Sequence, residues 1–335
     1  MLQLQNQTPF RATIAVFPDR NGIDTVHAIV KGTCVLHPAL AMAEEQIPIS
    51  MADEYYADPA ESSLKQVSDM HIGKPGTDVL LIGSAWAPQS SPVTESFVTL
   101  SVAERNQTIR VVGDRQWRSN GAPTDPQPFE SMPLVWERAF GGIDRSTEQT
   151  LAEERNPVGA GFAGKQAASI FAGRLLPNLE DPRTSLQKLG QLVEPICFAP
   201  IAPSWLPRRS FAGTYDAQWQ RSRAPYLPED FDPRFFQCAH PTFAFDRYLE
   251  GGEPITVEGT TPDAPISFAV PAVRLLVEFS VAGDTERPNV NLETLLIEPD
   301  ANRASFTWRA SVPCDRKVLK VEKIVVALAG GGGRT

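Results

Sequence analysis

Alternation of apolar and polar positions predicts short β-strands in the first third of the chain. The candidate strands are residues 11–17, 24–36, 47–50, 78–86, 95–103 and 107–112. Most are rich in β-branched residues, the run at 78–86 is apolar enough to be buried on both faces, and the last two flank a turn that predicts a hairpin. Together they predict antiparallel, β-sandwich-like sheets over residues 1–120.

Strand patterns return in the last third of the chain, residues 253–329. The candidates are residues 253–258, 266–270, 272–280, 291–298, 303–310 and 318–327. Two of these runs flank the turn sequence Pro299-Asp300-Ala301-Asn302, which predicts a second hairpin. Residues 330–335, GGGGRT, are expected to form a flexible tail. At this stage the two β regions are compatible with one body or with two separate sandwiches.

The middle of the chain, residues 121–252, has the composition of ordered loops. Short polar and aromatic phrases are broken by glycine and proline, of which the whole chain has 23 and 30, and only residues 184–192 predict a short helix. The density of Trp, Phe and Pro predicts that this region is laid over the sheets. The fold class expected is therefore mainly β, with a proline-rich, loop-dominated middle and a few short helices.

Residues 213–241, which we call the strap, concentrate aromatic residues between prolines. The prolines prevent a long helix or a central strand. Asp232-Pro233 predicts a helix start, and the four-residue spacing of Tyr215 and Trp219 predicts one or two helical turns with both rings on one face. We expect the strap to be ordered and its aromatic side chains to be largely buried, against the protein's own core or in part against another chain.

Charge and composition disfavour several classes of protein. The formal net charge is −9, whereas a nucleic-acid binder normally carries a basic face. The N-terminal residues lack the basic and apolar regions of a signal peptide, and no apolar run is long enough to predict a membrane span. The four cysteines are far apart and include no Cys-x-x-Cys motif, a pattern typical of reduced thiols in a cytoplasmic protein.

The titratable residues contain no obvious catalytic or metal-binding motif. The four histidines lack metal-ligand spacing, and Cys238 and His240 alone are too few for zinc, so we expect neither a metal nor a cofactor. Glu229, Asp230 and Asp232 crowd together as the paired carboxylates of a glycosidase would. Turn and helix-cap roles explain the two aspartates better, because Asp favours both positions.

A series of short phrases along the chain resembles one protein family. The phrases are VKGTCVL, SDMHIGKPGTDVLLIGSAWAP, VVGDRQW, MPLVWERAFGG, NPVGAGF, LPNLEDP, WLPRRSFAGTYDAQW, LPEDFDPRFFQCAHP and LIEPDANRASFTWRASVP. In this order they are similar to DUF2169, a family encoded beside VgrG spikes, PAAR-like tips and toxins in bacterial type VI secretion clusters. The likeness runs from about Phe10 to Ala327. It departs at His240-Pro241-Thr242-Phe243, where family members often carry a proline, an acid and paired glutamines.

The resemblance implies a cytoplasmic adaptor or chaperone, and not an enzyme. Such a protein would hold an effector toxin or its PAAR-like domain and help to load it onto the VgrG spike. We expect its binding surface in the loop at residues 69–78 and in the strap. The candidate residues are Asp69, Lys74, Pro75, Asp78, Tyr215, Trp219, Tyr226, Phe231, Phe235 and His240. Two alternatives are a hydrolase that uses Asp230 and Asp232 or His71, and a carbohydrate-binding β-sandwich with an aromatic groove.

Overall fold

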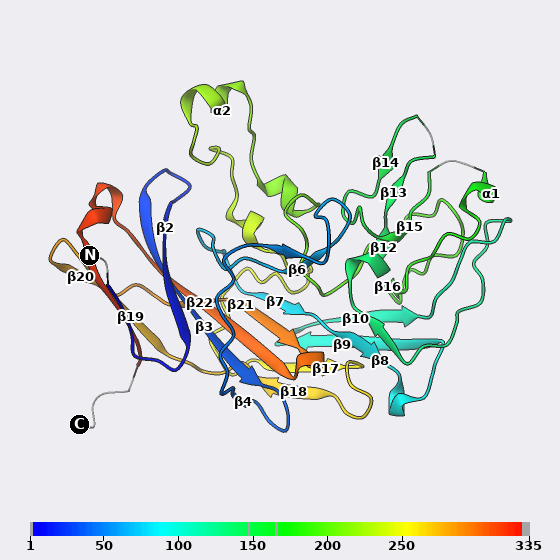
Figure 1. Ribbon diagram of the computed structural model, residues 1–335, viewed down its shortest axis with the longest axis horizontal. Helices are drawn as coiled ribbons and strands as arrows, with labels where there is room; N and C mark the ends of the chain where they lie inside the picture. Colours follow the sequence, from blue (N-terminus) through cyan, green and yellow to red (C-terminus); the bar gives the residue numbers. More distant parts are fainter. Residues whose placement is uncertain (1–2, 147, 165–166, 330–335) are drawn as a thin grey trace.

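The protein is built mainly from β-strands, as Figure 1 shows for the computed structural model, which describes residues 3–146, 148–164 and 167–329. The α-helices are α1 (Ala168–Phe171) and α2 (Ala217–Ser222), and the 3-10 helices are η1 (Pro88–Ser90), η2 (Trp136–Arg138), η3 (Arg208–Phe211), η4 (Pro233–Phe236), η5 (Pro299–Ala301) and η6 (Asp315–Lys320). Within the described ranges, none of these helices has the length and apolar character needed to cross a membrane. The predicted fold class, mainly β with antiparallel sheets and few short helices, is confirmed.

The first and last thirds of the chain meet in one six-stranded sheet, in the order β2-β3-β22-β21-β7 with β4 added beside β3. Its strands are β2 (Arg11–Pro18), β3 (Asp24–Val35), β4 (Ala41–Met42), β7 (Asp78–Leu81), β21 (Asn291–Glu298) and β22 (Arg303–Pro313). β3 and β22 pair antiparallel, from Thr25 opposite Pro313 to Val35 opposite Arg303, whereas β7 pairs parallel with β21. The two β regions therefore share a sheet and form one body.

Two further sheets share the buried core with the six-stranded sheet. The four-stranded sheet contains β1 (Gln3–Asn6), β23 (Val321–Leu328), β19 (Leu275–Val281) and β20 (Asp284–Glu286), in that order. The five-stranded sheet contains β16 (Leu179–Glu180), β10 (Arg105–Val112), β9 (Glu95–Val102), β17 (Pro254–Glu258) and β18 (Ile266–Ala269), in that order. Val26, Ile109 and Ile324, one from each sheet, belong to a single buried apolar cluster. Removal of this shared apolar surface from water holds the three sheets together.

Short ladders and a second cluster order the loop-rich parts of the chain. In the first third, β5 (Glu54–Tyr55) pairs with β6 (Leu64–Gln66), and β8 (Ser84–Trp86) pairs with β11 (Ser131–Pro133) of the middle region. Within the middle region, β12 (Phe140–Gly141) pairs with β15 (Ala160–Gly161), and β13 (Ile143–Asp144) pairs with β14 (Leu151–Ala152). Trp117, Phe140, Phe171 and Leu186 form a small buried apolar cluster of their own. The aromatic residues of the middle region thus supply the packing that its few ladders lack.

The two faces of the six-stranded sheet differ in polarity because side chains alternate along each strand. On β22, Phe306 and Trp308 belong to the apolar core, whereas Thr307 and Arg309 point to the opposite face, where both bond Asp69. That polar face is buried as well, since Arg309 is 3% exposed and Lys31 of β3 is 4% exposed. Residues 43–78 and part of the strap cover it, and buried charges in such a place need partners.

The structure differs from the predicted elements in three places. Residues 47–50 form no strand because Pro48 has no N–H for a ladder, and β4 pairs with β3 instead. Residues 184–192 form turns and not a helix, and Gly190 has a left-handed φ of 77°. The apolar run at 78–86 is divided into β7 and β8, which belong to different sheets.

Candidate functional site

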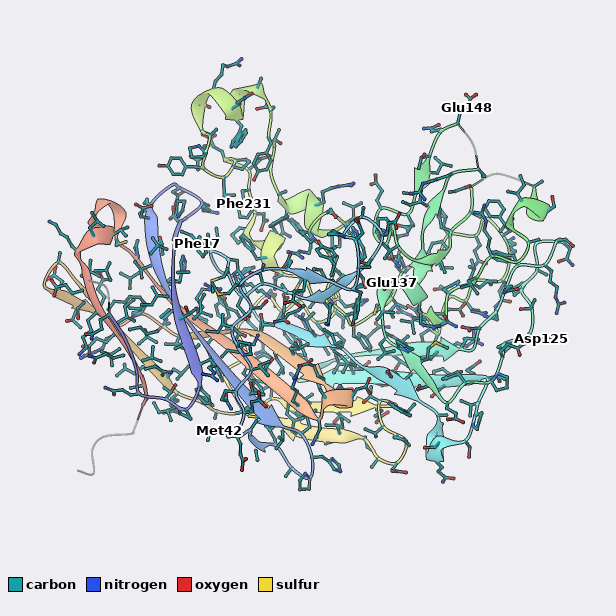
Figure 2. The ribbon with its side chains drawn as sticks, in the orientation of Figure 1. Phe17, Met42, Asp125, Glu137, Glu148 and Phe231 are labelled. Atoms are coloured by element: carbon teal, nitrogen blue, oxygen red, sulfur yellow. The ribbon has the colours of Figure 1, made fainter. Side chains whose placement is uncertain are left out.

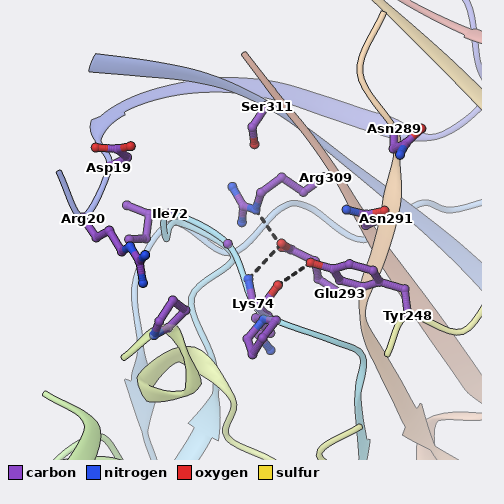
Figure 3. Close-up of a pocket in the computed structure, with 13 residues that line it drawn as sticks. Asp19, Arg20, Ile72, Lys74, Tyr248, Asn289, Asn291, Glu293, Arg309 and Ser311 are labelled. Carbon is purple, nitrogen blue, oxygen red and sulfur yellow. Dashed lines mark hydrogen bonds and ion pairs between the residues drawn. The ribbon is translucent and has the colours of Figure 1, made fainter. Parts of the chain in front are cut away.

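A cleft of about 500 Å³ opens on the polar face of the six-stranded sheet (Figure 3). One wall is the tip of the β2–β3 hairpin, with Asp19 and Arg20, and another is the loop at residues 72–75. Pro233 of the strap and the polar side chains at the start of β21 and the end of β22 complete the lining. The cleft therefore joins the loop and the strap, the two stretches in which the sequence predicts the binding surface.

Lys74 and Asp78 form a buried ion pair beneath the cleft. Lys74 Nζ lies 2.7 Å from Asp78 Oδ2 and donates to Thr294 Oγ1 at 2.9 Å. The backbone N–H of Cys238 in the strap donates to the same Asp78 oxygen at 2.8 Å. Burial alone would lower the pKa of Lys74, but the Asp78 carboxylate raises it above its ordinary value. Lys74 therefore stays charged, and Asp78 joins the loop to the strap through the N–H of Cys238.

Arg309 is held by the loop and by a neighbouring strand. Its Nε donates to Glu293 Oε2 at 2.6 Å, and its Nη2 donates to the backbone carbonyl of Asp69 at 2.7 Å. The second oxygen of Glu293 accepts the backbone N–H of Lys74 at 3.0 Å, as Figure 3 shows. Glu293 thus bonds through both carboxylate oxygens and Arg309 through Nε and Nη2, and these contacts fix the loop on the sheet.

Asp69 and His71 complete the buried polar layer. The Asp69 carboxylate lies 2.9 Å from Lys31 Nζ and accepts the backbone N–H of Ser50 at 2.8 Å. His71 stacks on Phe236 of the strap, with ring centroids 5.2 Å apart. Burial, followed by the charge of Arg309, lowers the pKa of His71 well below its ordinary value. The imidazole is therefore neutral, and Nδ1 is free to accept the backbone N–H of Gly73.

The four loop candidates occupy different environments. Asp69, Lys74 and Asp78 are 6%, 4% and 0% exposed, so their charges are used inside the protein. Pro75 is exposed and lines the cleft, and Lys74 lines it as well. A partner that enters the cleft would therefore meet Pro75 and the small exposed part of Lys74, whereas Asp69 and Asp78 do not line it.

The strap consists of a base and a projecting lobe. In the base, residues 231–241, Asp232 caps η4 by accepting the N–H of Arg234 at 2.9 Å, so the predicted helix start is correct. Phe231 and half-buried Phe235 pack edge to face, with ring centroids 5.9 Å apart, and Phe231 lies where the lobe meets the body (Figure 2). The base is therefore anchored by aromatic packing.

The lobe, residues 214–230, projects from the body at α2 (Figure 1) and bonds largely to itself. Asp230 accepts the N–H and the hydroxyl of Thr214 at 2.9 and 2.7 Å, which closes the lobe at its neck. The indole of half-buried Trp219 donates to the Tyr226 carbonyl at 2.8 Å. Tyr215 and Tyr226 are 54% and 43% exposed, so the expectation of largely buried aromatics is wrong for the lobe. Hydrogen bonds within the lobe hold its shape, so its order does not require burial of these two rings.

The lobe contacts the tip of the β2–β3 hairpin. Arg223 donates a hydrogen bond to the backbone carbonyl of Arg20. A Cβ added at Gly22 would lie 3.2 Å from the ring of Tyr226, so this glycine permits the close approach. The exposed ring of Tyr226 and the hairpin wall of the cleft therefore lie side by side.

His240 lies apart from the cleft, beside a second cavity of about 250 Å³ that includes Trp136 and Ile201. Burial lowers its pKa to about 4, although Asp181 acts in the opposite direction. Burial likewise raises the pKa of Cys238 to about 12. Within the described ranges, no group of three or more His, Cys, Asp or Glu side chains is placed to hold a metal ion.

The acidic residues of the strap have local partners. The pKa of Asp230 is lowered by the N–H and hydroxyl of Thr214, and the pKa of Asp232 is lowered chiefly by hydrogen bonding to Arg234. Hydrogen bonds to the charged form favour an ionised carboxylate. Both residues therefore act as local acceptors, the role that their turn and cap positions indicate.

Arg309 and Glu293, which position the loop beneath the cleft, were not predicted from the sequence. A signal was present in β22, where Ser305, Thr307 and Arg309 recur at every second position opposite apolar residues. Such alternation normally indicates a face in water. Here the face is covered, and the polar residues become a buried network.

One comparison with known proteins gives a match. The model of a family described as an uncharacterized protein conserved in bacteria, DUF2169, matches residues 21–309. These residues include the loop, the whole strap, Glu293 and Arg309. No curated protein and no solved structure matches the chain.

Proposed function

We propose that this chain, which belongs to the bacterial family DUF2169, is a cytoplasmic adaptor or chaperone for type VI secretion. In this proposal it binds an effector toxin or its PAAR-like domain and aids its loading onto the VgrG spike. The phrases from VKGTCVL to LIEPDANRASFTWRASVP motivate the partner class. The proposal requires neither a cofactor nor catalytic turnover.

The observation that carries the proposal is the lobe beside the cleft. Tyr215 and Tyr226 are exposed on an ordered lobe that leans on the hairpin wall of the cleft. Aromatic side chains are enriched in protein interfaces because they bury a large area at a small cost in conformational entropy. This surface suits a partner chain that covers the rings and enters the cleft.

The environment of the titratable groups supports binding over hydrolysis. A general acid or base needs a pKa near the working pH and access to substrate. His71 is buried and held neutral, and Asp232 is occupied by Arg234 and the start of η4. Proton transfer at these positions would require the structure around them to open first.

Deletion of the gene in the producing bacterium tests the function. Without its adaptor, the cognate toxin should lose abundance or solubility in the producing cell, because its apolar surface is left exposed. Secretion of unrelated cargo should continue. A toxin that stays soluble and is secreted normally without the protein would contradict the proposal.

Substitution of Tyr226 tests the surface. Tyr226→Ala should weaken copurification of the toxin or PAAR-like protein, whereas Tyr226→Phe keeps the ring and should retain most of it. Both variants should melt at nearly the wild-type temperature, because Tyr226 is 43% exposed. Equal recovery with all three proteins would exclude Tyr226 from the interface. Charge reversal at Lys74 is a poor test, since the ion pair with Asp78 is buried and its loss would unfold the site.

A further inference from the structure

Within the part of the chain that the structure describes, strand β2 uses only one of its two edges for hydrogen bonding. It lies at the end of the six-stranded sheet, and its ladder partner there is β3. The N–H of Asp19 donates to the Ile23 carbonyl at 2.8 Å, so the opposite residues 19 and 23 form a hydrogen-bonded pair of the antiparallel ladder. Ladder bonds recur at every second residue, so those of β2 fall on its odd-numbered residues. Ala12, Ile14 and Val16 therefore direct their N–H and C=O groups away from β3.

A second contact confirms this alternation. The N–H of Cys314 donates to the Asp24 carbonyl at 2.8 Å, so the even-numbered residues of β3 bond to β22 and its odd-numbered residues bond to β2. Among the described residues, no backbone or side-chain hydrogen bond reaches the outward groups of Ala12, Ile14 or Val16. Val16 is 38% exposed, which places its part of the edge in water.

Three other sheet edges are protected. The edge of β7 is covered, since Val79 N donates to the Phe243 carbonyl at 3.0 Å and Leu81 N donates to the Phe198 carbonyl at 3.1 Å. β18 lies between Pro265 and Pro271, and β20 has three exposed residues, two of them acidic. Prolines, charges and short length are common means of preventing strand addition. β2 has eight residues, and those from 12 to 17 include neither a charge nor a proline.

We propose that β2 is a docking edge, to which an extended segment of the partner adds as a further strand. This inference rests on the proposed function, because it assumes that the partner is a protein chain. The outward groups at every second residue match the main-chain groups of an extended peptide, and few other ligands satisfy such a row. The addition would lengthen the six-stranded sheet beside the hairpin tip and the lobe.

The charges near β2 indicate the chemistry of the segment. Arg11 begins the strand and Arg20 follows it at the hairpin tip, and both are exposed. Asp19, the acid that directly follows β2, is engaged by the N–H groups of Asn21 and Ile23 at 2.7 and 2.9 Å. An alternating apolar segment with an acidic residue at each end would therefore complement this edge.

The position of the lobe indicates that the segment added to β2 comes from a different protein and not from a second copy of this chain. Tyr226 packs at Gly22 on the hairpin tip, so the exposed ring continues the surface at one end of β2 only. A foreign partner can contact the edge and the lobe together. A two-fold pair of β2 strands would place the two lobes at opposite ends of the interface.

Substitution of Val16 separates edge bonding from side-chain packing. Val16→Pro removes an outward N–H that the ladder does not use, whereas Val16→Ala shortens the same side chain and keeps that N–H. Val16→Glu is a second blocking variant, because a charge at an edge opposes strand addition, here of an acidic segment. Thermal unfolding confirms that each variant folds.

Binding is measured with two probes. One is the purified toxin or PAAR-like protein of the proposed function, and the other is a capped peptide of alternating valine and threonine with a glutamate at each end. We expect Val16→Pro and Val16→Glu to weaken both interactions by about tenfold or more, and Val16→Ala to change them by less than about threefold.

The outcomes separate the inference from the function. If the toxin or PAAR-like protein binds wild type and the three Val16 variants equally, the docking edge is wrong and the adaptor function stands. If it binds none of them, the adaptor function is wrong and the inference that depends on it is also wrong. If wild type is a dimer that Val16→Pro dissociates, the edge serves a second copy, and the partner assignment is overturned.

Discussion

The two edges of the six-stranded sheet differ in whether other segments of the chain hydrogen-bond to them. The residues that follow the strap run beside β7. The N–H of Thr77 donates to the Arg247 carbonyl at 3.0 Å, and the N–H of Phe245 donates to the Thr77 carbonyl at 2.9 Å. Along β2, the outward groups of Ala12, Ile14 and Val16 meet no bonding partner within the described residues. One edge is closed by the protein's own chain, and the other is open.

This difference gives the loop-rich middle of the chain a structural role. Residues 198 and 243–247 supply the bonds that close β7, and the base of the strap is tied to the same edge through Cys238 and Asp78. A long segment without regular structure is therefore ordered because it hydrogen-bonds the backbone groups along the edge of β7. The lobe does not take part in this closure, and it leans on the hairpin beside the open edge.

Removal of the Asp78 carboxylate should have the largest effect on the closed edge. Asp78→Ala leaves Lys74 charged, buried and without its partner, and it also frees the N–H of Cys238. We expect a loss of about 3–5 kcal/mol in the free energy of unfolding, measured by urea denaturation. The paired replacement Lys74→Met with Asp78→Leu should recover much of this loss, because neither charge remains. A single variant as stable as wild type would show that the ion pair does not hold this edge.

A methyl group at Gly76 should have the next largest effect. A Cβ there would lie 2.2 Å from the Phe245 carbonyl oxygen, so the covering segment would have to move. We expect Gly76→Ala to cost about 2–3 kcal/mol in the free energy of unfolding. Gly252 is a matched control, because a Cβ would meet nothing within 4 Å, although its φ of 94° keeps some strain in that variant. A Gly76→Ala variant that is as stable as wild type would mean that close packing at β7 is unimportant.

Acid should loosen the closed edge through His240. Its carbonyl accepts the N–H of Phe243, which covers β7, and burial lowers its pKa from 6.5 to about 4. The unfolded chain takes up this proton as pH falls below about 6.5 and the folded chain does not, so the stabilising contribution is complete above that pH and is lost toward pH 4. We expect a loss of about 1–2 kcal/mol between pH 7 and pH 5 from this residue. Urea titrations of His240→Gln should show a correspondingly smaller pH dependence, and an unchanged dependence would contradict the assignment.

Local patterns in the sequence predicted the strands but not how the strands pair. Alternation located β2, β3, β21 and β22 to within a few residues, because side-chain periodicity is a local property. The pairing of β3 with β22 joins residues 24–35 to residues 303–313, and no local signal encodes it. The choice between one body and two sandwiches depended on this pairing.

The sequence predicted a shared surface for the loop and the strap but not the environment of its residues. Pro75 of the loop and Pro233 of the strap line one cleft, whereas the charges of Lys74 and Asp78 are used inside the protein. Exposure of Tyr226 depends on the lobe closing on itself through Thr214 and Asp230, a contact over sixteen positions that composition does not reveal. Whether the candidate residues contact a partner stays a prediction.

Amide hydrogen exchange of β2 and β7, with and without the toxin or PAAR-like protein, tests the central claim most directly. In the free protein, the amides of Ala12, Ile14 and Val16 should exchange quickly, and those of Val79 and Leu81 should exchange slowly. On binding, the three β2 amides should become protected while the β7 amides stay unchanged. Amides of Ala12, Ile14 and Val16 that keep exchanging quickly in a saturated complex would contradict the claim that this open edge receives the partner.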